Sequence, residues 1–200
     1  MDTDSRPAGR LERQKPNEMT NTGEIRREPF VLHAPSRHAR MRTVDERFVR
    51  SRLATIFQLA LDVERWPQLL PHYRFVRFRE RTSDDGGIVE MSANRPFGPF
   101  NWPTWWVSQM SVQRKALRGG DEPLVRFRHI EGITTGMDVE WSFHPDKGGT
   151  KVRLVHAWNG PPWPVVGGVA AANVIGPVFV HGIASRTLEG LARIAEQEPI

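Results

Sequence analysis

The chain has 200 residues, of which 38% are hydrophobic, which is enough for one core in a domain of ordinary size. It contains no cysteine, so neither a disulfide framework nor a thiolate metal site or nucleophile is available. The formal net charge is +5, but much of the excess lies near the N-terminus without a nucleic-acid-binding motif, so we expect no nucleic-acid partner.

Residues 1–41 differ from the rest of the chain in composition, because they are rich in Pro, Arg, Asn, Glu and Thr and have few apolar residues. Such a segment buries too little apolar surface to offset the entropy lost on ordering, which predicts a disordered basic tail. It shows no apolar stretch behind a charged start and no small-residue cleavage site, so we expect no secretory signal and a cytoplasmic location. One ordered domain is expected over residues 42–197.

The first ordered elements are predicted to be a strand and a broken helical segment. The strand is expected over TVDERFVRS, from Thr43. Apolar residues then recur at helical spacing, at Ile56, Leu59, Ala60 and Val63. Pro67 and Pro71 interrupt a regular helix, which predicts two short helices after the first strand.

Six further strands are predicted in close succession, at residues 73–80, 88–93, 105–112, 124–130, 137–143 and 151–158. Each is bounded by clusters of Gly, Pro, Asp or Ser, and short links between consecutive strands require antiparallel pairing. In the fifth of these, Met137, Val139, Trp141 and Phe143 alternate with polar residues. One face of the sheet is therefore expected to be covered and the other to face water.

The element available to cover this sheet is the C-terminal stretch from about residue 165 to 196. Its apolar residues have the spacing of a helix face, at Ile183, Leu188, Leu191 and Ile194. The order of elements predicts an α+β helix-grip fold, in which about seven antiparallel strands wrap around a long C-terminal helix.

Three segments in this order resemble the START-like (SRPBCC) superfamily, in the branch of polyketide cyclases, aromatases and coenzyme Q-binding proteins. They read LATIFQLALDVERWPQLLPHYRFVRF, GMDVEWSFHPDKGGTKVRLVHAW and VFVHGIASRTLEGLARIAE. The resemblance covers about residues 43–195. It implies a deep cavity between the sheet and the long helix, which holds flat or isoprenoid ligands.

Two motifs of the aromatase/cyclases have counterparts in this chain. In those enzymes a Trp and a Tyr seven positions apart follow the first helix, and Trp66 and Tyr73 match this pair. A Trp-x-Ser-x-Arg pattern lies on a middle strand of those enzymes, and Trp106 and Ser108 match it, but Met110 stands in place of the arginine. The resemblance implies that the arginine binds or polarises a polyketide carbonyl, for which methionine has no donor.

The loss of this arginine leaves two interpretations open. Another polar group takes its place, for which His156, Arg128 and Gln109 are the candidates, or the cavity binds its ligand without catalysis.

Three residues are candidates for catalysis: Tyr73, Ser108 and His156. Tyr73 is the only phenol and lies where the second helix meets a strand, so its hydroxyl can point into the cavity as a donor or weak acid. His156 shares the apolar face of its strand with Leu154 and Trp158, and its ordinary pKa near neutrality suits a general acid or base. A structural role, with each side chain tied by a hydrogen bond in the core, is the alternative for Tyr73 and His156.

The candidates for ligand binding are large and apolar: Trp66, Trp106, Met110, Phe127, Trp141 and Trp158. Tryptophan offers a broad flat face for stacking on a ring. Filling of the core is the alternative for each, and the clean alternation around Trp141 favours it there. His129, His144 and His156 fall on different strands without metal-ligand spacing, so we expect no metal and no other cofactor.

Two functions are compatible with such a cavity. The first is cyclisation and dehydration of a polyketide, in which confinement orients the reacting atoms. The second is non-catalytic binding or transfer of a quinone or lipid, which Met110 favours because it adds a soft apolar group. The partner in either case is a hydrophobic small molecule, and the protein is expected to be a monomer or homodimer.

The stretch 163–180 carries no charge, but its prolines and glycines weaken a membrane-spanning helix. A cavity-lining helix start and lid is the favoured interpretation, and transient contact with a membrane surface is the second.

Overall fold

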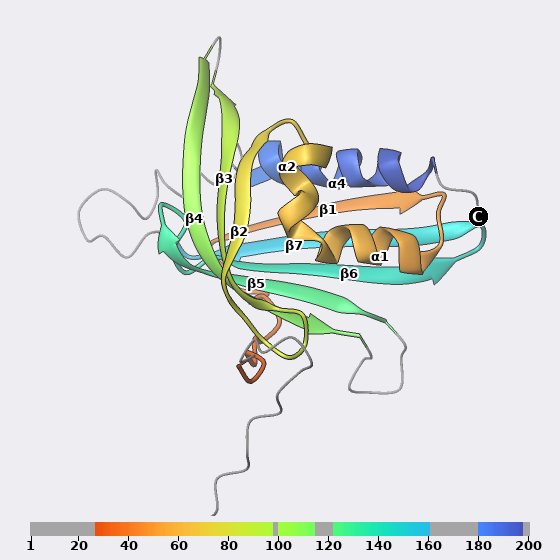
Figure 1. The fold of residues 1–200 in the computed structure, drawn as a ribbon, viewed down its shortest axis with the longest axis horizontal. Helices are drawn as coiled ribbons and strands as arrows, with labels where there is room; N and C mark the ends of the chain where they lie inside the picture. The colour runs from red at the N-terminus through yellow and green to blue at the C-terminus, as the bar shows by residue number, and fades with distance from the viewer. Residues whose placement is uncertain (1–26, 98–99, 115–121, 161–179, 198–200) are drawn as a thin grey trace, which may run out of the picture.

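The computed structural model describes residues 27–97, 100–114, 122–160 and 180–197 (Figure 1). Seven strands form one antiparallel sheet in the order β1-β7-β6-β5-β4-β3-β2. The bounds are β1 (Met41–Val49), β2 (Tyr73–Arg81), β3 (Gly87–Phe97), β4 (Phe100–Gln113), β5 (Leu124–Gly132), β6 (Asp138–Asp146) and β7 (Gly149–Trp158). Consecutive strands from β2 to β7 are neighbours, and β1 pairs with β7 at the far edge.

Helices lie on one side of this curved sheet. The α1 helix (Leu53–Leu61), a 3-10 turn η1 (Val63–Arg65) and the short α2 helix (Trp66–Leu69) connect β1 to β2. The C-terminal α4 helix (His181–Ala195) packs against β1, β3 and α1 (Figure 1). This arrangement confirms the predicted helix-grip fold. The part of the predicted long helix that precedes residue 180 lies outside the described residues.

The core lies between the sheet and the helices, on the face that the alternation predicted. Phe127 on β5 and Trp141 and Phe143 on β6 are buried, and Leu188 and Leu191 of α4 belong to the same cluster of buried residues. Removal of this apolar surface from water is the main contribution to the stability of the domain.

The β3 and β4 strands extend further toward their shared turn than the sequence predicts. The Asn94 amide of β3 still donates to the His72 carbonyl at 2.7 Å. Beyond Asn94 on β3 and before Trp106 on β4, the described ladders pair the two strands with each other, as a ribbon that projects from the sheet (Figure 1). Pro96 and Pro103 lie in this ribbon, although proline cannot donate to a ladder of hydrogen bonds. Both edges of an isolated ribbon are open, so proline is tolerated in it.

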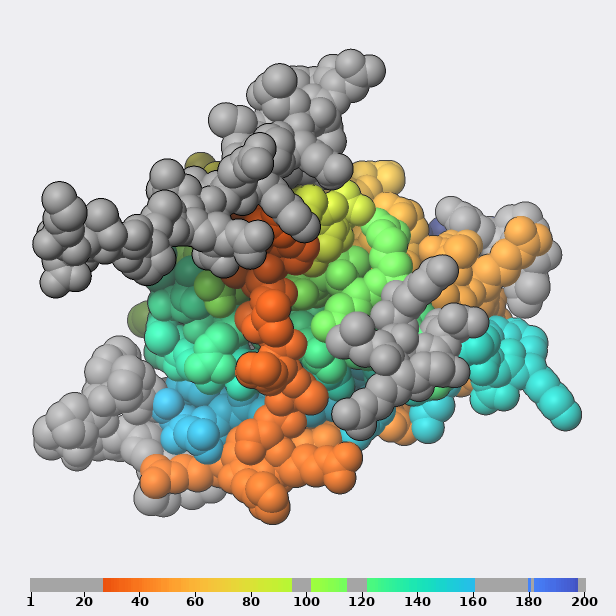
Figure 2. Space-filling model, turned by 90° about the horizontal axis from the view of Figure 1, so that it is seen from below, coloured from red at the N-terminus to blue at the C-terminus, as the bar shows by residue number. Residues whose placement is uncertain are grey.

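The outer face of the sheet is crossed by residues 27–40, which belong to the predicted tail (Figure 2). The Arg27 amide donates to the Arg81 carbonyl at 3.1 Å, and the Arg126 guanidinium donates to the Leu32 carbonyl at 3.1 Å. This part of the tail is therefore attached to the sheet. The rest of the predicted tail lies outside the described residues.

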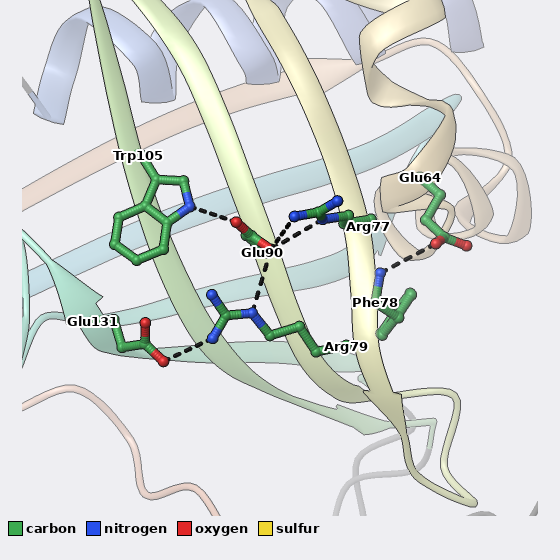
Figure 3. Close-up of polar contacts among 7 residues, drawn as sticks. All are labelled: Glu64, Arg77, Phe78, Arg79, Glu90, Trp105 and Glu131. Carbon is green, nitrogen blue, oxygen red and sulfur yellow. Dashed lines mark hydrogen bonds and ion pairs between the residues drawn. The ribbon is translucent and has the colours of Figure 1, made fainter.

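The outer face also carries an ionic network, which is centred on Glu90 of β3 (Figure 3). The buried Glu90 carboxylate accepts from the Trp105 indole N–H at 2.7 Å and lies 2.9 Å from Arg77 Nη2 and 3.3 Å from Arg79 Nε. Arg79 also pairs with Glu131 at 2.8 Å. The hydrogen bond from Trp105, followed by those from the two arginines, lowers the pKa of Glu90 below its ordinary value.

In the described parts of the chain, every helix is too short or too polar to cross a lipid bilayer.

Candidate functional site

A cavity of about 70 Å³ lies between α4 and the inner face of the sheet. Its wall is mostly aromatic and aliphatic, and it is formed by α2, by α4 and by every strand from β2 to β7. No arginine or lysine occurs among the described residues that line it. Besides the indole N–H groups of its tryptophans, the polar groups of the wall are hydroxyls and imidazoles, on Tyr73, Ser108, His129, Thr134, His156 and Thr187.

Aromatic rings in mutual contact form one side of the cavity. The ring centroids of Trp66 and Tyr73 are 5.2 Å apart, and those of Tyr73 and Trp106 are 6.4 Å apart. The ring centroids of Trp66 and Trp141 are 6.2 Å apart. The Trp66 indole N–H donates to the Leu59 carbonyl at 3.0 Å, so the one polar atom of this ring is used by α1. The faces of these rings can therefore contact an apolar, ring-bearing ligand.

Tyr73 is linked to α4 through a threonine. Thr187 Oγ1 lies 3.3 Å from the Tyr73 hydroxyl, 2.8 Å from the Ile183 carbonyl oxygen and 3.1 Å from His72 Nε2. Burial, with a smaller effect of the Arg186 charge, lowers the pKa of His72 to about 4. His72 is therefore neutral at physiological pH.

Ser108 and His129 face each other from neighbouring strands. They are partners in the β4–β5 ladder, next to a shift of register, and both side chains line the cavity. Ser108 is completely buried, and its hydroxyl has no hydrogen-bond partner among the described residues. The His129 ring stacks on Trp106 at 5.9 Å, and its Nδ1 lies 2.6 Å from Thr134 Oγ1. Thr134 therefore fixes the orientation of this imidazole.

His156 enters the cavity from β7, where it pairs with Val139 of β6 and is buried. Tyr73, Ser108, His129 and His156 thus come from four different strands and line one cavity. Imidazole and phenol are groups that can accept or give a proton in a reaction.

Seven of the nine residues singled out in the sequence line this cavity: Trp66, Tyr73, Trp106, Ser108, Phe127, Trp141 and His156. Met110 and Trp158 do not belong to the described wall. Met110 is completely buried two residues beyond Ser108 and pairs with Phe127, further along the sheet. Trp158 is buried, and its indole N–H donates to the Thr135 carbonyl at 3.0 Å, in the turn that follows β5.

The wall also contains functional groups that were not selected from the sequence, namely His129, Thr134 and Thr187. The alternation of β5 already placed His129 on the same face as Phe127, which is a usable signal. Thr187 lies four residues after Ile183 and four before Leu191, so helical spacing already placed it on the apolar face of the C-terminal helix. Thr134 lies in a turn, where no local pattern indicates that it meets the cavity.

Within the described ranges, no group of three or more His, Cys, Asp or Glu side chains is arranged to hold a metal ion.

Among solved structures, several proteins share this fold at low sequence identity. The Zhui aromatase/cyclase from a Streptomyces species aligns with a TM-score of 0.63 and 14% identity, over 78% of this chain and 93% of that one. A START superfamily protein from Mycobacterium smegmatis aligns with a TM-score of 0.55 and 14% identity, over 78% and 97% of the two chains. A STAR-related lipid transfer protein from Xanthomonas axonopodis aligns with a TM-score of 0.54 and 16% identity, over 81% and 90%.

No curated protein sequence matches the chain significantly. The family model described as polyketide cyclase / dehydrase and lipid transport matches residues 49–176, which is more than half of the chain. With the helix-grip fold and the internal cavity, this match establishes that the chain belongs to the polyketide cyclase / dehydrase and lipid transport family.

Proposed function

We propose that this protein binds a hydrophobic, ring-forming polyketide in its cavity and assists the cyclisation and dehydration of that molecule. The observation that carries the proposal is the completely buried Ser108 hydroxyl, which has no partner among the described residues and lies across the ladder from His129. A buried polar group without a hydrogen bond costs about 1–3 kcal/mol. A ligand with oxygen atoms would supply the missing hydrogen bond.

The polar groups of the wall suit both steps of such a reaction. An imidazole, from His129 or His156, removes a proton from a methylene between two carbonyls, and the resulting enolate carbon attacks a second carbonyl. The C–C bond closes the ring, and the carbonyl oxygen takes up a proton to become a hydroxyl. Loss of this hydroxyl as water needs a base, for which an imidazole removes a proton from the neighbouring carbon so that the C–H electron pair forms the C=C bond. It also needs a proton donor for the leaving hydroxyl, which is the role we assign to Tyr73. The aromatic wall orients the chain, and orientation supplies much of the rate acceleration.

The volume of the cavity sets a condition on this proposal. Pockets that hold drug-sized molecules measure roughly 300–1,000 Å³, whereas the described residues enclose about 70 Å³. A ligand with fused rings therefore requires the wall to open, and we expect α4 to move away from the sheet when the ligand binds.

Turnover of a polyketide model substrate tests the proposal. A synthetic poly-β-ketone that forms a coloured aromatic product is incubated with the protein, and the product is followed by absorbance and chromatography. We expect Tyr73→Phe with His156→Ala, and separately His129→Ala, to lower the rate at least about tenfold. Trp106→Ala should lower it as well, because Trp106 lines the cavity.

The control is Trp102→Ala, because Trp102 lies on the same strand but is 63% exposed and does not belong to the described cavity wall. It should retain the rate of the unaltered protein. A product distribution that equals the uncatalysed one in all of these proteins would contradict the cyclase function.

A second function, binding or transfer of a quinone or lipid, is favoured by one observation. The buried Met110 replaces the arginine that the cyclase-like pattern leads one to expect, and no cationic side chain lines the described wall. Such a carrier works in the cytoplasm and touches a membrane surface transiently to load its ligand. Native mass spectrometry of protein purified from its own host separates the two functions, because a bound polyprenyl quinone or lipid would favour the carrier.

A further inference from the structure

An open surface groove lies on the other side of the cavity wall, between α4 and the α2–β2 corner. It has a volume of about 440 Å³, and its polar lining consists of His72, Asn94, Arg186, Glu189 and Arg193. His72 belongs to this groove, whereas its neighbour in sequence, Tyr73, belongs to the cavity. His72, immediately before β2, and Tyr73, its first residue, therefore line two different spaces.

Thr187 connects these two spaces through hydrogen bonds. Its Oγ1 lies within hydrogen-bond distance of Tyr73 on the cavity side, at 3.3 Å, and of His72 on the groove side, at 3.1 Å. Its shortest contact is to the Ile183 carbonyl one turn earlier in α4, at 2.8 Å. A hydroxyl has one proton to donate and two lone pairs that accept. In the resting protein Thr187 therefore donates to Ile183 and can accept from both Tyr73 and His72.

This arrangement can reverse when Tyr73 loses its proton. The Thr187 hydroxyl then turns from Ile183 to the phenolate oxygen, since a hydrogen bond to a charged acceptor is about twice as strong as one to a neutral acceptor. His72 continues to donate to Thr187 through an Nε2–H. Two donors in series then point from the groove toward the negative charge in the cavity.

We propose that Thr187 and His72 are positioning residues, which act through Tyr73 by stabilising the negative charge on its oxygen when it gives its proton to the ligand. This inference rests on the proposed function for the role of Tyr73 as a proton donor. The O–H bond of Tyr73 breaks, its proton goes to the leaving hydroxyl of the ligand, and the electron pair stays on the phenolate oxygen. The C–O bond of the ligand breaks and the hydroxyl leaves as water, while an imidazole of the cavity wall takes a proton from the neighbouring carbon and the C–H electron pair forms the C=C bond. The imidazolium then returns this proton through water to Tyr73, which restores both groups.

The titratable groups around these hydrogen bonds are compatible with donation from His72 to Thr187 and from Thr187 to the Tyr73 oxygen. His72 keeps the neutral form that donates one proton, because burial and the Arg186 charge lower its pKa to about 4. Glu189 and Arg193 lie in the groove, and His129 and His156 are the other titratable groups of the cavity wall.

The close approach of α4 to the α2–β2 corner places Thr187 between the side chains of Tyr73 and His72. Gly190, one turn after Thr187, permits this approach, because a Cβ atom there would lie 2.3 Å from Leu70 Cδ2. Leu70 is buried and ends the α2 turn immediately before Pro71 and His72. A side chain at residue 190 would therefore require Leu70 or the helix to shift.

The pKa of Tyr73 tests the proposal directly, because Tyr73 is the only tyrosine in the sequence. Tyrosinate absorbance in a pH titration reports this one residue without any substrate. We expect Thr187→Val, which keeps the shape but removes the hydroxyl, to raise the pKa of Tyr73 by about one unit, a tenfold fall in its acid dissociation constant. Thr187→Ser should restore the value of the unaltered protein.

Two further variants complete the experiment. His72→Phe should raise the pKa of Tyr73 by a smaller amount, about half a unit, because it removes only the outer donor. Thr150→Val is the matched control, since Thr150 is also completely buried but donates to Ser51, away from Tyr73. Circular dichroism at each pH shows that the titrated protein is folded, and if Thr187→Val does not fold, the His72→Phe result decides.

An unchanged Tyr73 titration in Thr187→Val, or equal shifts for Val and Ser at this position, would overturn the proposal. Because no substrate is used, the result is separate from the turnover assay. A protein without cyclase activity can still show the predicted shift, in which case the proposed function fails and the positioning role of Thr187 and His72 stands.

Discussion

The two faces of strands β2 to β4 differ in how their polar atoms are satisfied. On the outer face, Glu90 receives hydrogen bonds from Trp105, Arg77 and Arg79, so each of these groups has a protein partner (Figure 3). On the inner face, the Ser108 hydroxyl is completely buried and has no partner among the described residues. The polar atoms of the outer network are therefore satisfied within the protein, whereas the inner face contains a buried hydroxyl that the described residues leave without a hydrogen bond.

The largest loss of stability is expected for a substitution in the core on the inner face of the sheet. Phe143 is completely buried and contacts the Phe57 ring edge to face at 5.3 Å. Phe143→Ala should lower the free energy of unfolding by about 3–5 kcal/mol, because it leaves a void in a packed core. Phe48→Ala is the matched control, since Phe48 is 44% exposed, and it should cost about 1 kcal/mol at most. Equal losses in urea-induced unfolding would contradict the assignment of the core to the inner face.

A smaller loss of stability is expected when the ionic network on the outer face is disrupted. Glu90→Ala removes the acceptor that Trp105 and two arginines share, which should lower the free energy of unfolding by about 1–2 kcal/mol. Because the pKa of Glu90 is lowered in the folded protein, this contribution is present above the ordinary value of 4.5 and is lost as the pH falls through the folded value.

Glu46→Ala is the control for this variant, since Glu46 forms ion pairs with Lys151 and Arg153 on the exposed surface. Surface ion pairs contribute little, so its unfolding midpoint should equal that of the unaltered protein. A Glu90 variant that is as stable as the Glu46 variant would show that the outer network has no structural role.

His72, which lies between the cavity and the groove, should make the free energy of unfolding depend on pH. The pKa of His72 falls from 6.5 to about 4 on folding, so between these pH values the unfolded chain binds a proton that the folded chain does not. Stability should therefore rise as the pH increases from 4 to 6.5 and gain nothing further above 6.5. Since His72 is only half-buried, the gain is about 1–2 kcal/mol. The difference in unfolding free energy between the unaltered protein and His72→Phe isolates this effect, and a difference that is independent of pH would refute it.

The smallest change in stability is expected at Ser108. Ser108→Ala removes a buried hydroxyl without a described partner, so the protein should keep its stability or gain up to about 1 kcal/mol. Binding of a hydroxylated naphthalene, followed by quenching of tryptophan fluorescence, should nevertheless weaken about threefold to tenfold. Ser111→Ala provides a comparison on the same strand, where the side chain is buried outside the described cavity wall, and it should leave the affinity unchanged. A Ser108 variant with lower stability and unchanged affinity would indicate a structural hydroxyl.

The sequence by itself determined the order of the elements and the buried face of each strand. Alternation with a period of two residues places Phe127, Trp141 and Phe143 on one side of the sheet, and this pattern depends only on local backbone geometry. Alternation on the last strand also indicated His156, whereas Ser108 was indicated by the resemblance to the cyclase pattern, and both residues line the cavity. Local patterns were insufficient for the β3–β4 ribbon, because the effect of Pro96 and Pro103 depends on which edges of the strands are paired.

Only the tertiary structure decided which residues of the buried face meet the cavity. Met110 and Trp158 follow the correct alternation, but they lie in packed regions beyond the described wall. Thr187 of α4 meets Tyr73 and His72 because two elements more than one hundred residues apart pack closely at Gly190. Periodicity reports which face of an element is buried, whereas the contacts between elements depend on how the helix lies across the sheet.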